Sequence, residues 1–167
     1  RMMGLAPAVW HMNEGHAALL VLALLEEKLA SRVHEETVPT DLIDAVREQC
    51  VFTTHTPVEA GHDRFPYELA RRLLSNGPPD ESQLVEFAML QQLGGGGHLN
   101  MTRLALNLSE VVNGVARRHA EISGQMFPGY QVRAITNGVH PFTWTADGFR
   151  ELYDRYVPGW CHEPELL

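Results

Sequence analysis

The stretch Val51–Asp63, with the sequence Val-Phe-Thr-Thr-His-Thr-Pro-Val-Glu-Ala-Gly-His-Asp, constrains the fold more than any other part of the chain. Its first residues are β-branched or aromatic, which is typical of a strand packed on both faces. Pro57 lacks a backbone donor and favours an extended Thr56, so we expect the strand to end there. Ligands of open α/β sheets bind at the carboxyl ends of strands, which makes Thr54, His55 and Thr56 candidate contacts. The alternative is that His55 only hydrogen-bonds a neighbouring backbone group.

The segments before this strand predict a βαβ arrangement. Residues Leu5–Trp10 enter a short strand, a polar turn follows at His11–His16, and the helix from Ala17 to Leu25 is apolar on every side. We expect Asn13 to cap this helix. A second helix at Thr40–Gln49 leads into the strand at Val51, so the two strands are predicted to be parallel with a right-handed crossover.

The second half of the chain is predicted to continue with more helices and a third strand. The predicted elements are a helix at Pro66–Leu74, a helix from Asp80 to Leu93, a helix from Asn100 through Val112, a strand at Gln131–Thr136 and a helix at Ala146–Tyr156 capped by Thr145. Gly94–Gly97 is interpreted as a loop or hinge, because it lacks the spacing of a phosphate-binding motif. Gly114 interrupts a predicted helix at a cost of about 1 kcal/mol, which indicates a close approach to its backbone.

Composition excludes several classes of protein. A chain of 167 residues with 44% hydrophobic content predicts a single globular domain. A net charge of −8 argues against a nucleic-acid partner, and no apolar run is long enough for a membrane span. The start of the chain lacks the regions of a signal peptide, so we expect a cytoplasmic protein. The two cysteines predict neither a disulfide framework nor a zinc ribbon.

Three polar turns carry the candidate chemistry. They follow the three predicted strands at His11–His16, Thr54–Thr56 and Thr136–Gly138, and they line one crevice if the strands are parallel neighbours. Nine histidines suggest a metal, but no HExxH motif is present, and no GxSxG motif supports a serine nucleophile. Imidazole, amide, carboxylate and hydroxyl groups without clustered cations suit a neutral, polyhydroxylated ligand.

Five motifs in fixed order resemble those of the α-glucan (glycogen, starch and maltodextrin) phosphorylases, the bacterial branch most of all. The motifs are Val9–Ala18 (Val-Trp-His-Met-Asn-Glu-Gly-His-Ala-Ala), Phe52–Asp63, Asn100–Leu106 (Asn-Met-Thr-Arg-Leu-Ala-Leu), Val112–Ala116 (Val-Asn-Gly-Val-Ala) and Ile135–His140 (Ile-Thr-Asn-Gly-Val-His). The resemblance extends from about Leu5 to Trp160. It implies a GT-B architecture, in which residues 1–167 are a single partial domain, the last part of a Rossmann-like N-terminal domain.

The resemblance also implies a reaction and its participants. Phosphorylases use orthophosphate to remove the terminal glucose of an α-1,4-glucan as glucose 1-phosphate, and pyridoxal phosphate serves as their cofactor. In the family, the counterparts of His55 and Asn137 contact the 6-hydroxyl of the bound sugar. The resemblance also assigns Glu14 and His16 to an adjacent pocket, Asp63 to a gating loop and Val115 to a position near the sugar. Thr56, next to His55 at the end of the strand, is a further predicted substrate contact.

The sequence departs from the family by what it lacks. The cofactor lysine and its motif are missing, and Lys28 is the only lysine in the chain. We therefore predict a phosphorylase fragment that contributes sugar-contacting residues but no catalytic, cofactor-binding or metal-binding residue, and that is inactive alone. Two alternatives stay open: a non-catalytic sugar-binding or self-associating module, and a fragment of another GT-B glycosyltransferase.

Overall fold

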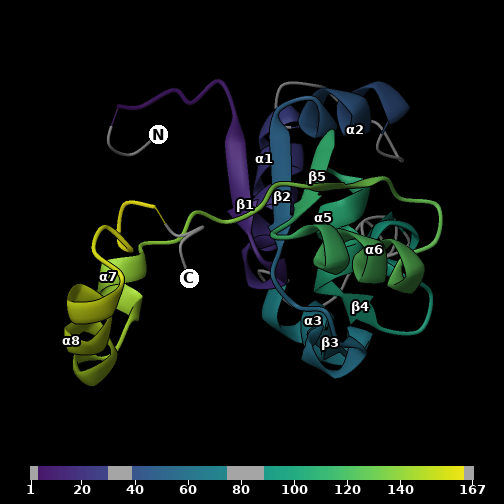
Figure 1. The fold of residues 1–167 in the computed structure, drawn as a ribbon. Helices are drawn as coiled ribbons and strands as arrows, with labels where there is room; N and C mark the ends of the chain where they lie inside the picture. Colours follow the sequence, from purple (N-terminus) through teal and green to yellow (C-terminus); the bar gives the residue numbers. More distant parts are fainter. Residues whose placement is uncertain (1–3, 30–38, 75–88, 164–167) are drawn as a thin grey trace. The chain divides into compact units, whose positions relative to one another are not determined.

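The computed structural model describes residues 4–29, 39–74 and 89–163 (Figure 1). The chain divides into two compact units, Arg1–Ile135 and Thr136–Leu167. The assignment of residues 1–167 to one partial domain stays a prediction. Within the described residues, no helix has the length and apolar character needed to cross a membrane.

The larger unit contains a four-stranded sheet in the order β1-β2-β5-β6, and each neighbouring pair is parallel. The strands are β1 (Trp10–Asn13), β2 (Cys50–Thr54), β5 (Val111–Gly114) and β6 (Val132–Ala134). The predicted α/β class, with a short parallel and partial Rossmann-like sheet, is confirmed. Parallel pairing places the carboxyl ends of all four strands at one edge of the sheet.

Helices and short connecting elements complete the two units. The helices are α1 (Leu19–Leu29), α2 (Thr40–Arg47), α3 (Tyr67–Leu74), α5 (Met101–Asn107), α6 (Arg117–Met126), α7 (Pro141–Trp144) and α8 (Asp147–Tyr156). The 3₁₀ turns η1 (Gly15–Ala17) and η2 (Glu59–Gly61) follow β1 and β2 along the chain, and β3 (Arg64–Phe65) pairs antiparallel with β4 (Leu99–Asn100). Residues 89–94 are also helical, whereas the rest of the helix predicted from Asp80 lies outside the described residues.

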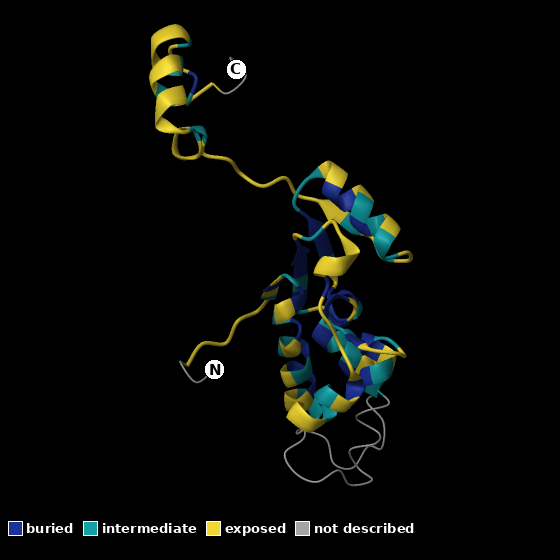
Figure 2. Cartoon of the chain, turned by 90° about the horizontal axis from the view of Figure 1, so that it is seen from below, coloured by how far each residue is buried: buried dark blue, intermediate teal, exposed yellow. Residues whose placement is uncertain are grey.

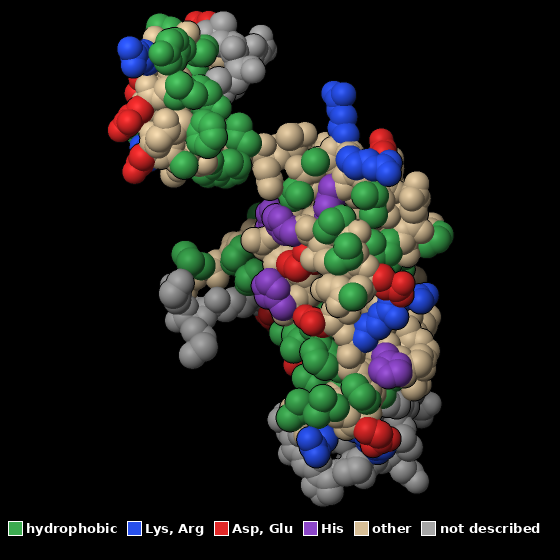
Figure 3. Space-filling model, turned by 60° about the horizontal axis from the view of Figure 1, so that its bottom comes forward, with side chains coloured by type: hydrophobic (Ala, Val, Ile, Leu, Met, Phe, Trp, Pro, Cys, Tyr) green, Lys and Arg blue, Asp and Glu red, His purple; other side chains and the backbone are tan. Residues whose placement is uncertain are grey.

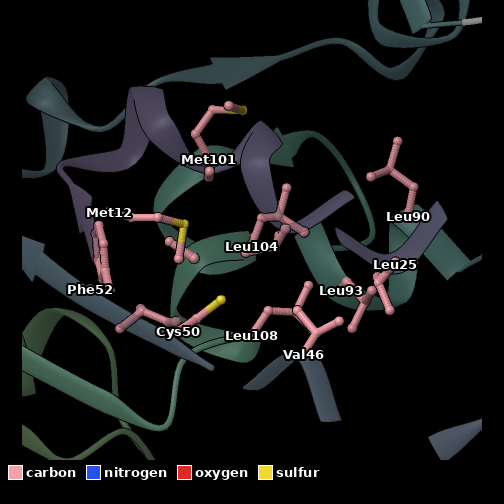
Figure 4. Close-up of a cluster of buried hydrophobic side chains, with 14 of the residues drawn as sticks. Met12, Leu25, Val46, Cys50, Phe52, Leu90, Leu93, Met101, Leu104 and Leu108 are labelled. Atoms are coloured by element: carbon pink, nitrogen blue, oxygen red, sulfur yellow. The ribbon is translucent and has the colours of Figure 1, made fainter. Parts of the chain in front are cut away.

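The hydrophobic core lies against one face of the sheet. Met12 pairs in register with Phe52, both are fully buried, and they share the core with Leu104 of α5 (Figure 4). Because side chains alternate across a strand, Asn13 and Thr53 face the other side. Burial of the apolar side chains is the main favourable term in folding, and full burial of one Phe or Met contributes about 1.5–3 kcal/mol.

The turn predicted at His11–His16 begins too early. His11 and Asn13 lie in β1, since this strand pairs with β2 as far as Asn13. Asn13 is therefore not a helix cap, and Glu14 takes that role at η1 by accepting from the amide of Gly15. Asn100 does cap α5 as predicted, because its Oδ1 accepts from the amide of Arg103 at 2.9 Å.

The helix predicted from Asn100 through Val112 is wrong at its end. α5 stops at Asn107, and Val111 begins β5, which pairs with β2 on one side and β6 on the other. The close approach predicted at Gly114 is confirmed, since an added Cβ would lie 2.4 Å from Nδ1 of His119. Gly114 ends a strand rather than interrupting a helix.

The smaller unit consists of α7, α8 and the turns around them. Among residues 136–163, Trp160 is the buried one, and its indole Nε1 donates to Asp154 at 2.9 Å. The cap predicted at Thr145 is wrong, because Ala146 occupies the N-cap of α8 while the Thr145 hydroxyl donates to the carbonyl of Pro141. Most side chains of α7 and α8 are exposed (Figure 2).

Candidate functional site

The ends of β1 and β2 bring the first two predicted polar turns together. Asn13 pairs in register with Thr53, and the backbone N–H of Glu14 donates to the carbonyl of Thr53 at 2.9 Å. The next residues along β2 therefore lie beside Glu14. Oδ1 of Asn13 lies 2.5 Å from Nε2 of His55. Because an amide oxygen only accepts, Nε2 carries the proton, and in the neutral ring Nδ1 is left as an acceptor.

The carboxylate of Glu14 bridges from β1 to the chain that leaves β2. Its Oε2 accepts from the backbone N–H of His55 at 2.7 Å and from the hydroxyl of Thr56 at 3.0 Å. Its Oε1 accepts from the N–H of Gly15 at 3.0 Å and, at 3.4 Å, from the hydroxyl of Thr54. Four donors thus converge on one half-buried carboxylate at the carboxyl edge of the sheet.

These donors keep Glu14 ionised. Partial burial acts to raise the pKa of Glu14, but hydrogen bonds from the amides of His55 and Gly15 and from the hydroxyl of Thr56 outweigh burial. The pKa of Glu14 consequently lies below its ordinary value. A carboxylate that accepts backbone hydrogen bonds is stabilised in its charged form, and such charge-assisted bonds are stronger than neutral ones.

Glu14 also has an unusual backbone. Its φ of 74° and ψ of 165° lie in a region occupied almost only by glycine, and no other non-glycine residue of the described chain has a positive φ. A residue held there costs on the order of 1–3 kcal/mol. Such strain persists only where surrounding contacts determine the conformation, and the four donors to the carboxylate are those contacts.

A hydroxyl relay crosses three strands next to this cluster. The hydroxyl of buried Thr53 donates to Oδ1 of Asn113 at 2.9 Å. Nε2 of His11 lies 2.7 Å from the same hydroxyl oxygen. Since the hydroxyl proton goes to Asn113, the oxygen accepts from Nε2–H of His11. The relay connects β1, β2 and β5 on the face opposite the core.

His62 anchors the loop after β2, and sequence reasoning did not select it. The residue is only 5% exposed, its Nδ1 lies 2.8 Å from Oγ1 of Thr102, and its ring meets the Phe127 ring in a T-shaped contact with 5.0 Å between centroids. Burial lowers the pKa of His62 below its ordinary value, and the charge of Glu14 opposes this only in part. No local sequence signal marks His62, because its partner Thr102 is 40 residues away.

The remaining predicted residues lie in several places. His16 is exposed in η1, Val115 directly follows β5 and is half-buried, and Asp63 is exposed while its carbonyl accepts from the N–H of Met101 at 3.1 Å. Asn137 is exposed in the smaller unit, so its predicted contact with the same sugar as His55 stays a prediction. The face of the molecule drawn in Figure 3 exposes several histidine side chains.

A cavity of about 250 Å³ lies away from this cluster. Its lining includes Arg47, Glu110 and Gln131, which lie near the amino ends of the strands, and none of the predicted site residues. Among the described residues, no group of three or more His, Cys, Asp or Glu side chains could hold a metal ion.

Comparisons with known proteins agree with the motifs. The chain is 36% identical to the maltodextrin phosphorylase of Thermococcus litoralis over 94% of its own length and 19% of that protein. It is 34% identical to a glycogen phosphorylase of Mycobacterium tuberculosis over 87% of the chain and 18% of the relative. A glycogen phosphorylase of Aquifex aeolicus is 26% identical over 93% of the chain and 23% of the relative. The chain is a relative of the α-glucan phosphorylases.

The match covers one segment of these phosphorylases. The chain spans about a fifth of the length of the curated relatives it matches, 19% of the Thermococcus litoralis protein and 18% of the Mycobacterium tuberculosis protein. No protein-family model matches it. The segment related to phosphorylases includes the cluster of Asn13, Glu14 and His55 at the carboxyl edge of the sheet.

Proposed function

We propose that this chain forms one wall of the glucosyl-binding site of an α-glucan phosphorylase. The parent enzyme would use orthophosphate to release the terminal glucose of an α-1,4-glucan as glucose 1-phosphate, and we expect it to act in the cytoplasm. The observation that carries this proposal is the convergence of Asn13, Glu14 and His55 at the carboxyl ends of two adjacent parallel strands. That edge is where open α/β sheets bind ligands.

His55 has the chemistry that a sugar hydroxyl requires. Its ring is exposed, and with Nε2–H directed to Asn13, Nδ1 can accept a hydrogen bond from a hydroxyl group. We assign the contact with the 6-hydroxyl of glucose to His55 and to Asn137. The neighbouring positions assigned to the same sugar site are His16, Thr56, Asp63 and Val115, with Glu14 at its edge.

The chain offers no lysine suited to hold the pyridoxal phosphate cofactor that the parent would carry. Lys28, the only lysine, lies in the last turn of α1. Its charge acts on Cys50, whose pKa burial raises to about 11, and Cys50 is the first residue of β2. His55 follows the opposite end of that strand. Cofactor and orthophosphate would therefore be bound by other parts of the parent.

Titration of the isotopically labelled chain with maltotriose tests the sugar site. We expect the imidazole and backbone NMR signals of His55 to shift as the sugar is added, and we expect His55→Ala to weaken binding about tenfold or more through loss of that hydrogen bond. Maltodextrin, orthophosphate and pyridoxal phosphate together should give no turnover with the chain alone. In the full-length parent, His55→Ala should lower kcat/KM by a similar factor.

An exposed histidine elsewhere provides the matched control. His98 lies outside the cluster, so His98→Ala should leave the maltotriose response of His55 unchanged. If His55→Ala reduces only solubility or yield while maltotriose still binds, the structural role of His55 is correct and the sugar site is not.

The two alternatives differ in what supports them. The names of the relatives favour a phosphorylase over another GT-B glycosyltransferase. Self-association gains support from large apolar side chains exposed in the smaller unit, among them Trp144, Phe149 and Tyr156. Self-association stays a prediction, and it is compatible with a fragment whose partner is the rest of a parent enzyme.

A further inference from the structure

Glu14 and Gly15, the two residues after β1, each have the backbone conformation that the other residue type would favour. Glu14 has the positive φ of 74° that suits glycine, whereas the neighbouring Gly15 has no positive φ. Glycine is needed at position 15 for a different reason, because a Cβ there would lie 2.9 Å from Oγ1 of Thr102. Position 14 thus combines a strained backbone with a glutamate side chain, and this combination indicates that the carboxylate itself is required.

The hydrogen bonds of the Glu14 carboxylate show whether it is free to bind a ligand. An ionised carboxylate has about four acceptor positions on its two oxygens. Donors within the chain approach all of them: the amides of Gly15 and His55 and the hydroxyls of Thr54 and Thr56. A hydroxyl of a ligand would have to displace one of these donors to reach Glu14.

We propose that Glu14 is a positioning residue, which holds the chain leaving β2 so that His55 presents Nδ1 to the sugar. This inference rests on the proposed function, in which His55 contacts the ligand. It changes the role of Glu14 from a sugar contact to a residue that acts through His55.

The geometry around His55 explains how the positioning works. Its backbone N–H is bound to Glu14 at 2.7 Å, and its Nε2 is bound to Asn13 at 2.5 Å. One bond fixes where the residue leaves the strand, and the other fixes the orientation and tautomer of the ring. With both donors of His55 used inside the chain, the acceptor Nδ1 is the atom left for a ligand.

Three substitutions separate the strained backbone from the carboxylate. Glu14→Gly relieves the backbone and removes the carboxylate, Glu14→Ala removes the carboxylate and keeps the strain, and Glu14→Gln keeps the shape and one acceptor oxygen. We expect amide hydrogen exchange of His55 to accelerate about tenfold or more in the Gly and Ala variants, and by a smaller factor in the Gln variant. We also expect Glu14→Gly to unfold at a higher temperature than Glu14→Ala.

Spectroscopic readouts at His55 distinguish positioning from a general loss of stability. The ring ¹⁵N shifts should change from one dominant tautomer towards a mixture in Glu14→Gly, while the amide of Phe52 in the core exchanges as in the wild type. Glu121→Ala, which removes an exposed carboxylate from α6, is the matched control and should leave His55 unchanged.

The outcomes separate this inference from the function on which it rests. Unchanged exchange and unchanged ring shifts of His55 in both Glu14→Gly and Glu14→Gln would overturn the positioning role, even if maltotriose binds. If the Glu14 variants release His55 but maltotriose never shifts its signals in the wild type, positioning is correct and the sugar site is wrong. Should Glu14→Gly not fold, Glu14→Gln carries the test alone.

Discussion

The neighbouring strands β2 and β5 end side by side, yet their ends are held in different ways. Thr54 pairs in register with Gly114, so the two chains leave the sheet at the same level. After β2, the chain is fixed by hydrogen bonds to the carboxylate of Glu14. At the end of β5, Gly114 is buried against the first turn of α6, where contact distances leave no room for a side chain.

This difference determines what each end tolerates. Hydrogen bonds can be exchanged for bonds to water or to a ligand at a modest net cost, and they respond to the protonation of their partners. Tight packing responds to volume instead, and it has no such alternative partner. The end of β2 is thus suited to meet a ligand, with exposed His55 next to it, while the end of β5 serves as a rigid neighbour.

Gly114→Ala should give the largest effect. The new Cβ would lie 2.4 Å from Nδ1 of His119 and 3.1 Å from the backbone nitrogen of Ala120. Since the second contact is with helix backbone, α6 must shift, and we expect a loss of about 3 kcal/mol in the free energy of unfolding, at the upper end for overpacking. Urea denaturation followed by circular dichroism measures it.

Gly124→Ala is the matched control for this prediction. Gly124 also lies in α6, but an added Cβ there meets nothing within 4 Å, so the substitution should stabilise the protein by up to about 1 kcal/mol through helix propensity. Adding His119→Ala to Gly114→Ala should recover part of the loss. A Gly114→Ala variant as stable as the wild type would mean that packing does not fix the end of β5.

The sequence predicted the end of β2 correctly, but it predicted a helix where β5 forms. The aromatic and β-branched run before Pro57 marks one strand without ambiguity. Val111 and Val112 fit a helical repeat as well as a strand, and only pairing with β2 and β6 decides between them. These partner strands lie 60 residues before β5 and 20 residues after it, beyond the reach of local periodicity.

The meeting of Glu14 and His55 was predictable from the sequence, whereas the hydrogen bonds between them were not. Parallel pairing of the strands implied that Glu14 and His55 would meet, and they do. No sequence signal predicted the positive φ of Glu14, because a positive φ is expected at glycine and the next residue, Gly15, is one. His62 escaped notice because its role depends on the loop returning to α5, a contact across 40 residues.

Thr53→Val tests whether the two strand ends are coupled through the face opposite the core. Valine keeps the shape and strand preference of threonine but leaves Oδ1 of buried Asn113 without its 2.9 Å donor. We expect a loss of about 1–2 kcal/mol, the cost of an unsatisfied buried group. Thr53→Val, Asn113→Ala and the double variant form a thermodynamic cycle in urea denaturation. Additive losses would show that the relay contributes nothing to the connection between β2 and β5.

The smallest effect should come from protonation of His62, in the loop after β2, as the pH is lowered. Burial holds the pKa of His62 below its ordinary value of 6.5, so its contribution to stability is complete above that pH. As the pH falls below 6.5, the unfolded chain takes up the proton first, and this contribution is lost on the way to the lower pKa of the folded state. Between about pH 7.5 and pH 5, the free energy of unfolding should therefore fall less steeply for His62→Gln than for the wild type.

Gly124→Ala, which changes stability without changing a titrating group, should keep the wild-type slope. Parallel curves for His62→Gln and the wild type would mean that His62 does not make the loop after β2 sensitive to pH, and the contrast between the ends of β2 and β5 would then rest on their contacts alone.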